Sequence, residues 1–547
     1  MADARRKFAV NATIVMGATM ASRVTGFFRE MLIPAKFGVG VVSDVYDVAF
    51  KFPDLMFSLL IGGAISAALV PVLSGSVSRG EEREGWQAIS RFINMTTALT
   101  IVVCVVGVIF SEQLVVLFAQ GWDPSSPEDA VKIATAARLT RVLFPSVSFL
   151  MLAGFANSVL YSYERFMYAA FGPVLYNVLC IASIAFLSGG GPEDYYYVDR
   201  VVTGVMLSSL TYCLFQTALA WRKIKGNYAF SFDFRHRGFR RLFGIALPSL
   251  VSSSAIQVNQ MVSASFSSRF EAGSIIAMRM ADRTWQMPYG IIAQSVGIAM
   301  LPDLSGRYAN RDIDGYKKLL TSALRYVLLL AIPVAAACLT INQLIMRTLF
   351  YNSNRMTEAD VALTASILAC YSTALITQSV NTILIRAFYA CNETRTPMLT
   401  GISIIGLNIM LSVLFYYLTG AGVRGMAFAY SISSLVNTVL LVFLLRRKIP
   451  GLNPLGGLAS FFIKTGCAAS GMAACLYLLG LATPAGLIAG PYSFSLKIKQ
   501  ILALAVNVAA GAAVYFGLLA VFKLPEASAV FGAVIKRIYK RRDIDKI

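Results

Sequence analysis

Charged residues are scarce in this chain, and acidic ones are scarcer than basic ones. Only 14% of its 547 residues are Asp, Glu, Lys or Arg, 57% are hydrophobic, and the mean hydropathy is +0.66. A soluble chain of this length would divide into domains of roughly 150 residues. Here apolar runs of about 20 residues recur from end to end, each long enough to cross a hydrocarbon core of roughly 30 Å. The composition therefore indicates a polytopic helical membrane protein.

The residue types that most often build catalytic and metal sites are few or scattered. His236 is the single histidine and lies in a basic loop, where a surface role is the usual one. The eight cysteines lie in or beside apolar runs and form no C-x-x-C pair, which argues against disulfides and zinc. No catalytic triad or nucleotide-binding loop is visible in the sequence. We therefore expect a protein that is not an enzyme and that uses no metal and no cofactor.

The apolar runs predict an all-α fold with about fourteen transmembrane helices. Their approximate limits are 10–33, 44–72, 89–111, 138–161, 166–188, 200–221, 242–266, 275–303, 322–341, 360–388, 397–418, 424–445, 458–481 and 498–522. The loops between them are short, and the loop of residues 222–241 is basic.

Basic residues gather in alternate loops. They occur before the first run, in the loop 222–241 and in the C-terminal tail, whereas the opposite loops hold acids such as Asp123 and Glu193. This positive-inside pattern predicts that both termini lie in the cytoplasm. The topology, helped by contacts with anionic membrane lipids, accounts for the net charge of +20. No nucleic-acid partner is needed to explain it.

The chain contains an internal repeat. Residues 43–76 align without a gap with residues 274–307, at an offset of 231. A second match pairs Asn157 with Asn381 at an offset of 224. The spacing equals six predicted helices, and an even number returns the copies to the same orientation, which predicts two parallel six-helix repeats. The predicted parts are an N-terminal lobe 1–222, a C-terminal lobe 223–448 that begins with the basic linker 222–241, and a segment 449–547 with two extra helices and a basic cytoplasmic tail.

Several charged residues lie inside predicted membrane helices, and they are the candidate substrate-binding residues. They are Arg23, Arg29, Asp44, Lys51, Arg279, Asp282 and Arg283. A charge at the bilayer centre costs roughly 3 kcal/mol on insertion scales, so such residues usually face a polar cavity. Most of these residues are basic, which favours an anionic cargo.

Helical spacing places these residues on shared faces. Polar residues recur every three or four positions between 44 and 58, and Arg279, Asp282 and Arg283 follow an i, i+3, i+4 pattern. One interpretation is structural: Arg and Asp pair internally, and Arg29 with Glu30 reaches toward the membrane surface. The functional interpretation is a basic cavity formed by the first, second and eighth helices. The planar fork of arginine suits a diphosphate, because it donates paired, charge-assisted hydrogen bonds and stays charged when desolvated.

Several motifs resemble those of the MurJ/MviN lipid II flippases, a family of the multidrug/oligosaccharidyl-lipid/polysaccharide exporter (MOP) superfamily. They are SRVTGFFRE at 22–30, SDVYDVAFKFP at 43–53, ADR at 281–283 with Pro288 and Gly290, LPDLS at 301–305, and RAFYA at 386–390 with TP at 396–397. The resemblance runs through about the first 450 residues.

This resemblance implies two six-helix lobes around a cavity and a groove for the polyprenyl tail at the last two helices. It places cavity arginines at Arg23, Arg29 and Arg283, and the helix-two aspartate and lysine at Asp44 and Lys51. The implied function is transfer of lipid II, the lipid-linked peptidoglycan precursor, from the inner to the outer leaflet by alternating access. The expected partners are lipid II, membrane lipids and cell-wall synthesis proteins, around a monomer in the bacterial cytoplasmic membrane.

Four other functions stay open at this point. The protein could be a flippase for another polyprenyl-linked oligosaccharide, or a drug exporter of the same fold, although a drug exporter should favour acids and aromatics over arginines. A membrane glycosyl- or phospho-transferase would need clustered acids in its loops. A non-transporting cell-wall scaffold would tolerate replacement of Arg23 or Arg283.

The chain also departs from the family pattern. A further arginine of the second helix aligns with Phe57, and a nearby acidic residue aligns with Gly62, so a cationic triad loses one member. Lys51 or Arg279 could compensate for it. Residues 242–266 and 397–445 contain no Asp or Glu, so we do not predict the sodium site that some family members carry.

Overall fold

A computed structural model describes residues 2–58, 66–189, 195–233, 242, 262–263, 265–352, 355–391, 393–418, 420–449, 451, 458–482 and 493–524. Within these residues the regular secondary structure is helical, which confirms the all-α prediction. Ten of the described helices are long and apolar enough to cross a membrane. The charged helices α1, α2 and α10 are not among these ten. The prediction of about fourteen spans is compatible with these helices, although the model does not fix that number.

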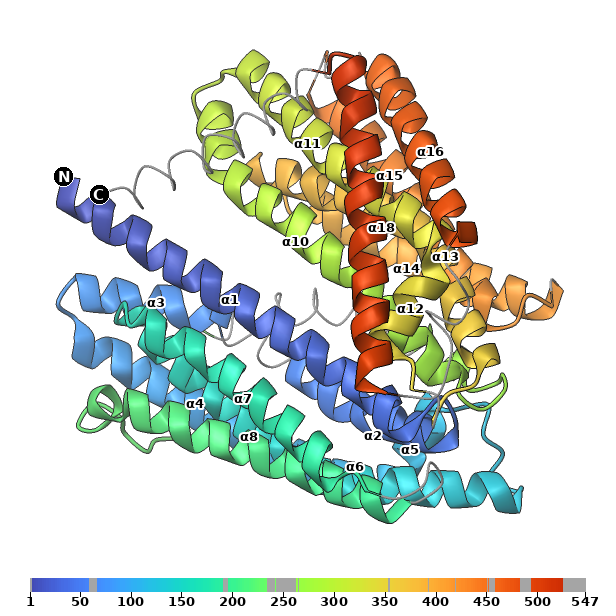
Figure 1. The fold of residues 1–547 in the computed structure, drawn as a ribbon. Helices are drawn as coiled ribbons and strands as arrows, with labels where there is room; N and C mark the ends of the chain where they lie inside the picture. Colours follow the sequence, from blue (N-terminus) through green and yellow to red (C-terminus); the bar gives the residue numbers. More distant parts are fainter. Residues whose placement is uncertain are drawn as a thin grey trace. The chain divides into compact units, whose positions relative to one another are not determined.

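By its internal contacts the chain divides into two compact units, Met1–Ile276 and Ala277–Ile547. The helices of the first unit are α1 (Ala2–Phe37), α2 (Val41–Phe57), α3 (Ser66–Ser78), α4 (Glu82–Ile109), α5 (Ser111–Phe118), α6 (Pro127–Ser162), α7 (Phe166–Leu187) and α8 (Tyr195–Ile224) (Figure 1). Helix α10 (Ser274–Ala309) begins in the first unit and continues into the second. The second unit adds α11 (Ile313–Thr340), α12 (Asn342–Phe350), α13 (Glu358–Ala390), α14 (Arg395–Leu418), α15 (Val423–Lys448), α16 (Leu458–Ala482) and α18 (Phe494–Val521).

Each unit is organised around one long central helix. In the first unit, α6 packs against α2, α3, α4, α5 and α8, and α1 packs against α7. In the second unit, α13 packs against α11, α12 and α15. Both central helices are long, apolar and largely buried along their middle turns, as expected for a helix surrounded by other helices.

The order and spacing of the helices repeat between the two units. Helices α4 and α11 begin 231 positions apart, at Glu82 and Ile313, and α5 and α12 begin with the same separation. Helices α6 and α13 also begin 231 positions apart, although different residues stabilise the two helix starts. Pro127 is the first residue of α6, whereas Thr357 and Asp360 form a capping box at the start of α13. The predicted duplication is therefore visible in the helix boundaries.

An asparagine bridges equivalent helices in each unit, half-buried at Asn157 and buried at Asn381. Asn157 of α6 donates to the Tyr212 hydroxyl of α8 at 2.6 Å, and its side-chain oxygen accepts from Gln216. Asn381 of α13 donates to the Ser434 carbonyl of α15 at 3.2 Å and accepts from Thr438 at 2.9 Å. In both units the partners lie four residues apart on the neighbouring helix. The two asparagines were aligned in the sequence, and their contacts are equivalent although their partners differ in type.

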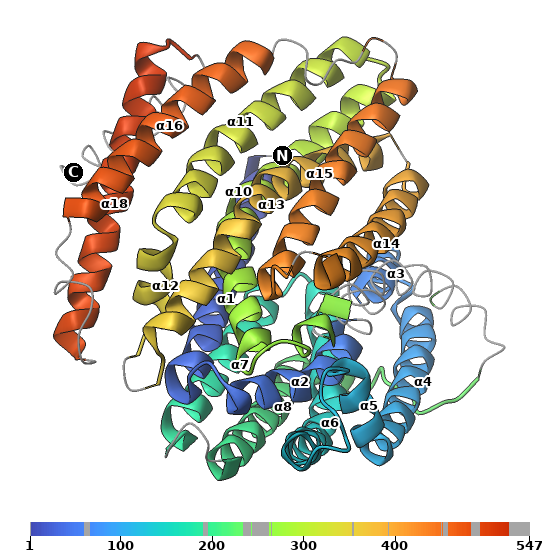
Figure 2. The same ribbon diagram turned by 90° about the vertical axis from the view of Figure 1, so that its right-hand side faces the viewer.

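The two C-terminal helices belong to the second unit. Helices α16 and α18 lie side by side and pack on α11, and α18 also contacts α12 (Figure 2). The Tyr515 hydroxyl of α18 donates to the Leu329 carbonyl of α11 at 3.0 Å. The Lys497 ammonium donates to the carbonyls of Arg347 and Thr348 at the end of α12. These polar contacts, buried among apolar side chains, fix the added pair on the repeat.

The helices differ from the predicted runs mainly at their ends. The run predicted at 138–161 is the middle of α6, which begins at Pro127, because a helix continues its hydrogen bonds through polar turns that hydropathy does not detect. The run predicted at 44–72 corresponds to two helices, α2 and α3. The short helices α5 and α12 were not predicted. The run 242–266 lies almost entirely outside the described residues.

Candidate functional site

The first helix presents Arg23 away from its packing partner. Asn177 of α7 donates to the Ser22 carbonyl of α1 at 3.1 Å. A Cβ atom on Gly26 would lie 3.4 Å from the Asn177 amide nitrogen, which is an ordinary van der Waals contact. Arg23 itself is exposed, and within the described part of the chain its guanidinium makes no hydrogen bond or ion pair. Arg23 is therefore free to bind an anion.

Arg29 is committed to neighbours in its own unit. Its guanidinium lies 2.9 Å from the Glu30 carboxylate and 5.8 Å from the centre of the Tyr176 ring on α7. Its side chain is 28% exposed. Glu30 offsets the charge of Arg29, which reduces the electrostatic attraction of an anion at this position relative to Arg23.

The predicted polar face of α2 contains two different arrangements. Asp47 is fully buried and forms an ion pair of 2.6 Å with Lys51, one helical turn later. Asp44 is only 4% exposed, and its two carboxylate oxygens accept the backbone N–H groups of Gly273 and Ile276, at 2.6 and 2.9 Å. These N–H groups belong to the start of α10, where backbone donors have no partner inside the helix. Asp44 is therefore the cap of α10.

The charged triplet of α10 separates into different environments. Asp282 accepts from the Trp285 indole at 3.1 Å and from the Gln286 amide at 2.6 Å. Trp285 stacks on Tyr371 of α13, with ring centres 5.9 Å apart. Arg279 and Arg283 are both half-buried. The Nε atom of Arg283 is buried and has no hydrogen-bond acceptor among the described residues.

Buried donors such as the Nε of Arg283 are usually satisfied in folded proteins, so this atom suits a ligand. Because the Nε of Arg91 likewise has no acceptor among the described residues, it is the place of Arg283 in the predicted charged triplet, and not the donor alone, that selects it. An unpaired guanidinium N–H in a membrane protein is costly unless an anion or water occupies it. A phosphate oxygen is a suitable acceptor for it. Arg23 and Arg283 are therefore the two predicted site residues whose contacts in the structure leave them available to an anionic ligand.

The structure divides the predicted residues between the two units. Arg23, Arg29, Asp44 and Lys51 lie in the first unit, on α1 and α2. The other three predicted residues lie on the part of α10 that belongs to the second unit. Phe57, at the position of the missing arginine, is half-buried in α2. Gly62 lies outside the described residues.

Sequence reasoning did not identify the neutral residues that orient these charges. Tyr176 beside Arg29, and Trp285 and Gln286 beside Asp282, carry no charge and belong to no chemical motif. The spacing of Asp282, Trp285 and Gln286 at i, i+3 and i+4 is the one signal that could have suggested contact. Arg386 was noted only as part of a motif, and it donates to the Gln294 side chain of α10 at 3.0 Å.

Comparisons with known proteins agree with the motifs. The family profile described as "Lipid II flippase MurJ" matches residues 33–493. A probable lipid II flippase MurJ of Buchnera aphidicola subsp. Schizaphis graminum is 29% identical over 438 residues, which cover 79% of this chain and 82% of that protein. The lipid II flippase MurJ of Burkholderia cenocepacia is 29% identical over 458 residues, covering 82% of this chain and 86% of the other.

Solved structures show the same fold. A structure of lipid II flippase MurJ in an inward closed conformation superposes with a TM-score of 0.71 at 22% identity, covering 93% of this chain and 99% of the other. An inward-facing MATE-family multidrug transporter of the MOP superfamily gives a TM-score of 0.64 at 15% identity, covering 81% and 98%. These similarities support a multi-pass protein of the bacterial inner membrane. Since the profile covers most of its length, this chain belongs to the MurJ family of lipid II flippases.

Proposed function

We propose that this protein moves lipid II from the inner to the outer leaflet of the bacterial cytoplasmic membrane by alternating access. Its membership of the MurJ family supports this cargo, since the related proteins are named lipid II flippases. Transfer between leaflets makes and breaks no covalent bond, so the protein needs no catalytic group. Both termini lie in the cytoplasm in this proposal, as the distribution of basic loops predicts.

Within the first unit the proposed phosphate-binding residue is Arg23, with Arg29 as a weaker contributor, and within the second unit it is Arg283. The buried, unpaired Nε of Arg283 is the single observation that most favours this assignment. An arginine fork can donate two parallel hydrogen bonds to phosphate oxygens, which fixes both the position and the orientation of the head group. Arg279 adds positive charge on the same helix as Arg283.

The remaining predicted residues act by positioning. Asp44 holds the beginning of α10, and therefore the start of the helix that carries Arg283. Asp282 accepts from Trp285 and Gln286 of its own helix, and Trp285 packs on Tyr371 of α13 in the second unit. Lys51 neutralises the buried Asp47. In this proposal the polyprenyl chain stays in lipid, along α16 and α18.

Binding must be moderate for transport to proceed. A cargo that binds the inward-open and outward-open states with equal affinity does not shift the equilibrium between them, however tight the binding is. The arginines must therefore hold the diphosphate differently in the two states. Membrane potential can act on the moving charges, at about 2.3 kcal/mol per charge per 100 mV.

The test is rescue of a bacterium depleted of its own lipid II flippase. We expect the parent protein to restore growth and the Arg23→Ala and Arg283→Ala variants to fail at equal membrane abundance. Arg141→Ala is the matched control, because Arg141 is an exposed arginine that pairs with Glu112 outside the proposed site. Rescue by both arginine variants would refute the cationic site. Failure of a well-expressed parent would instead refute lipid II as the cargo and favour another polyprenyl-linked oligosaccharide.

A further inference from the structure

An extended segment after α8 is tied to the side of α4 by side chains of that helix. Buried Asn94 donates to the carbonyls of Ala229 and Ser231, at 3.2 and 3.1 Å, and accepts from the Tyr228 hydroxyl. Buried Ser90 accepts the N–H of Ala229 at 3.1 Å. Three hydrogen bonds to the backbone and one to the Tyr228 side chain therefore fix residues 228–231 on the first unit. We call residues 228–232 the strap.

The strap holds two phenylalanine rings away from the protein. Phe230 is 77% exposed and Phe232 is 50% exposed. Their ring centres lie 5.1 Å apart in an edge-to-face arrangement, so they form one apolar patch. Successive side chains of an extended segment point to opposite sides, so Phe230 and Phe232, two residues apart, project to the same side.

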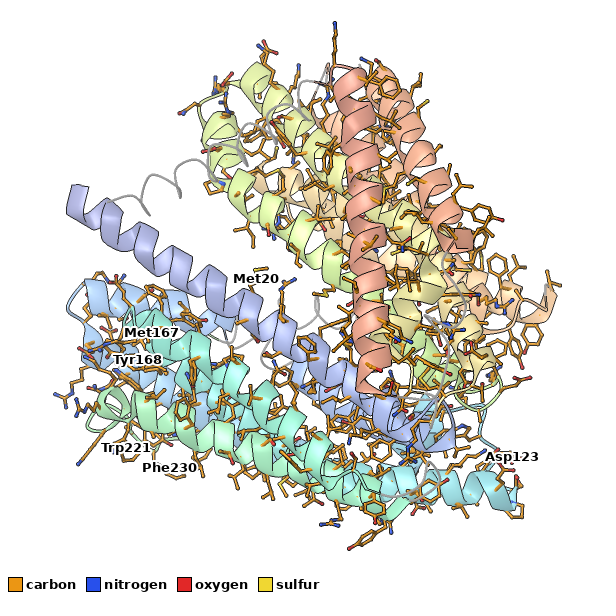
Figure 3. All side chains as sticks on the ribbon, in the orientation of Figure 1. Met20, Asp123, Met167, Tyr168, Trp221 and Phe230 are labelled. Carbon is orange, nitrogen blue, oxygen red and sulfur yellow. The ribbon has the colours of Figure 1, made fainter. Side chains whose placement is uncertain are left out.

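The neighbouring helix ends add exposed aromatic and sulfur-containing side chains. Met167 and Tyr168 at the start of α7, and Trp221 at the end of α8, are 66%, 44% and 53% exposed. Figure 3 labels these three residues and Phe230 at the same end of the first unit. Exposed apolar side chains in this number mark a surface that is covered by something in the working protein.

The positions of these residues identify the membrane as the cover. On α8, Leu207, Leu214 and Trp221 are all exposed and lie seven residues apart, so they share one face, and Trp221 stands at its end. On α4, the exposed apolar face begins at Leu99, five residues or about 7.5 Å beyond Asn94. The strap therefore lies where the lipid-facing surfaces of two membrane helices end. Tryptophan and tyrosine are typical of this level of the bilayer.

The charge around the strap identifies the lipid. Arg165, Arg222 and Lys225 are exposed beside the aromatic residues. In the sequence, four more arginines follow between positions 235 and 241. Basic residues at a membrane surface attract anionic head groups. We infer that the strap is an interfacial anchor, which inserts Phe230 and Phe232 into the head-group region and recognises anionic phospholipid through the surrounding basic residues.

The test places a fluorescent reporter on the strap of the full-length protein. Three of the four tryptophans, Trp86, Trp122 and Trp285, are at most 7% exposed. Trp221→Phe removes the exposed indole, and Phe230→Trp in that background adds one to the strap. The protein is reconstituted into phosphatidylethanolamine vesicles that contain phosphatidylglycerol, and into vesicles in which phosphatidylcholine replaces it. Quenching is measured with acrylamide in the water and with lipids spin-labelled near the head group or deep in the acyl chain.

We expect the shallow spin label to quench the Phe230→Trp reporter more strongly than the deep label. The acrylamide quenching constant should be at least about twofold lower with phosphatidylglycerol than with phosphatidylcholine. Adding Asn94→Ala should increase acrylamide quenching, because the strap loses its attachment. Adding Arg222→Gln and Lys225→Gln should remove the difference between the two lipids. Phe232→Trp in the same background repeats the measurement if Phe230→Trp does not reconstitute.

Two control reporters calibrate the result. Leu214→Trp, on the exposed face of α8, should be quenched by the deep label, and Ser125→Trp, in an exposed loop, should be quenched by acrylamide. Acrylamide quenching of the strap reporter equal to that of Ser125→Trp in both vesicles would show that the rings face water and would overturn the anchor. Shielding from acrylamide and from both lipid labels would show that protein covers the rings, and would also overturn it.

Discussion

Asp44 and Ile276 are 232 positions apart, yet the Asp44 carboxylate accepts the Ile276 N–H at 2.9 Å and so caps the first turn of α10. A cap is usually a residue just before the helix, within a few positions of the N–H groups it binds. Here α2 supplies the cap from a distant part of the chain. The same carboxylate also accepts the Gly273 N–H, so both of its oxygens have a partner.

Replacing Asp44 should therefore weaken the protein before it affects cargo binding. Asp44→Asn keeps one acceptor oxygen and loses one backbone contact, at a cost of about 1 kcal/mol, and Asp44→Ala loses both, at about 1–3 kcal/mol. Thermal unfolding in detergent should show the order parent, Asn variant, Ala variant. Asp54→Asn, at an exposed position of the same helix, is the control. Equal melting temperatures for parent and Asp44→Ala would mean that the cap contributes nothing.

A lysine at the proposed diphosphate site should bind the lipid more weakly than the arginine does. Arg283→Lys keeps the charge but loses the planar fork and the Nε donor, so we expect an approximately tenfold or greater loss in apparent affinity for the lipid. Binding of lipid II to the purified protein measures this directly. Arg141→Lys should bind as the parent does. If Arg283→Lys binds equally well, charge alone is sufficient and the fork geometry is irrelevant.

The equivalent asparagines of the two units should contribute similar amounts to the free energy of unfolding. Asn157→Ala and Asn381→Ala each remove two hydrogen bonds between neighbouring helices, so each should cost about 1–3 kcal/mol. Because each asparagine lies inside its own unit, we expect the effects to add in the double variant. Chemical unfolding of the single and double variants tests this additivity. A double variant no less stable than the singles would contradict the separate roles.

Two helical glycines, one inside each unit, allow a crowded position to be compared with an open one. A Cβ atom on Gly107 would lie 2.0 Å from the buried Phe144 ring, whereas one on Gly401 would meet no atom within 4 Å. Gly107→Ala should therefore destabilise the protein by about 1–3 kcal/mol, since the ring must move in a closely packed core. Gly401→Ala should be neutral or slightly stabilising, because alanine favours the helix. Detergent melting temperatures of the two variants decide the comparison.

Glu393, in the connection between α13 and α14, should make stability depend on acidification. Lys448 donates to its carboxylate at 2.8 Å, and the Thr396 N–H adds a second bond, which together lower the pKa of Glu393 below its ordinary value. A carboxyl whose pKa is lowered by folding stabilises the protein above its ordinary pKa, about 4.3 for glutamate, and this stabilisation is lost as the pH falls through the lower, folded value. The melting temperature of the parent should therefore fall more than that of Glu393→Gln in this acidic range. Parallel curves would show that the contact does not couple to folding.

Much of the fold could be predicted from the sequence. The offset between the two copies reappears in the starts of α4 and α11, because a duplicated chain keeps the lengths of its helices and loops. The asparagines at 157 and 381 were aligned before their contacts were known. The short helices α5 and α12 could not be predicted, because eight or nine residues are too few for a reliable period.

The division of the chain into two parts shows what sequence patterns do not reveal. The repeat and the basic linker suggested a division at residue 222, whereas the contacts group the chain up to Ile276 with the first unit. Two attachments account for this difference: Tyr228 and its neighbours bind Asn94, and Gly273 binds Asp44. Such contacts join residues more than a hundred positions apart, and no local sequence pattern predicts them.

The hydropathy of the chain, the helical period of its polar residues and the offset between its repeats are readable without a structure. They are enough to predict an all-helical, duplicated membrane protein whose unusual charges lie on three helices. The sequence also identified the family, because the motifs are contiguous. Only the tertiary structure decided how those charges are used. Asp44 caps a distant helix, Arg29 is paired with Glu30, and the buried Nε of Arg283 has no acceptor in the part of the chain that the structure describes. The reason is physical: whether a charged side chain is paired or available depends on which groups the fold brings within hydrogen-bond distance, and most of those groups are backbone atoms and neutral side chains from other parts of the chain.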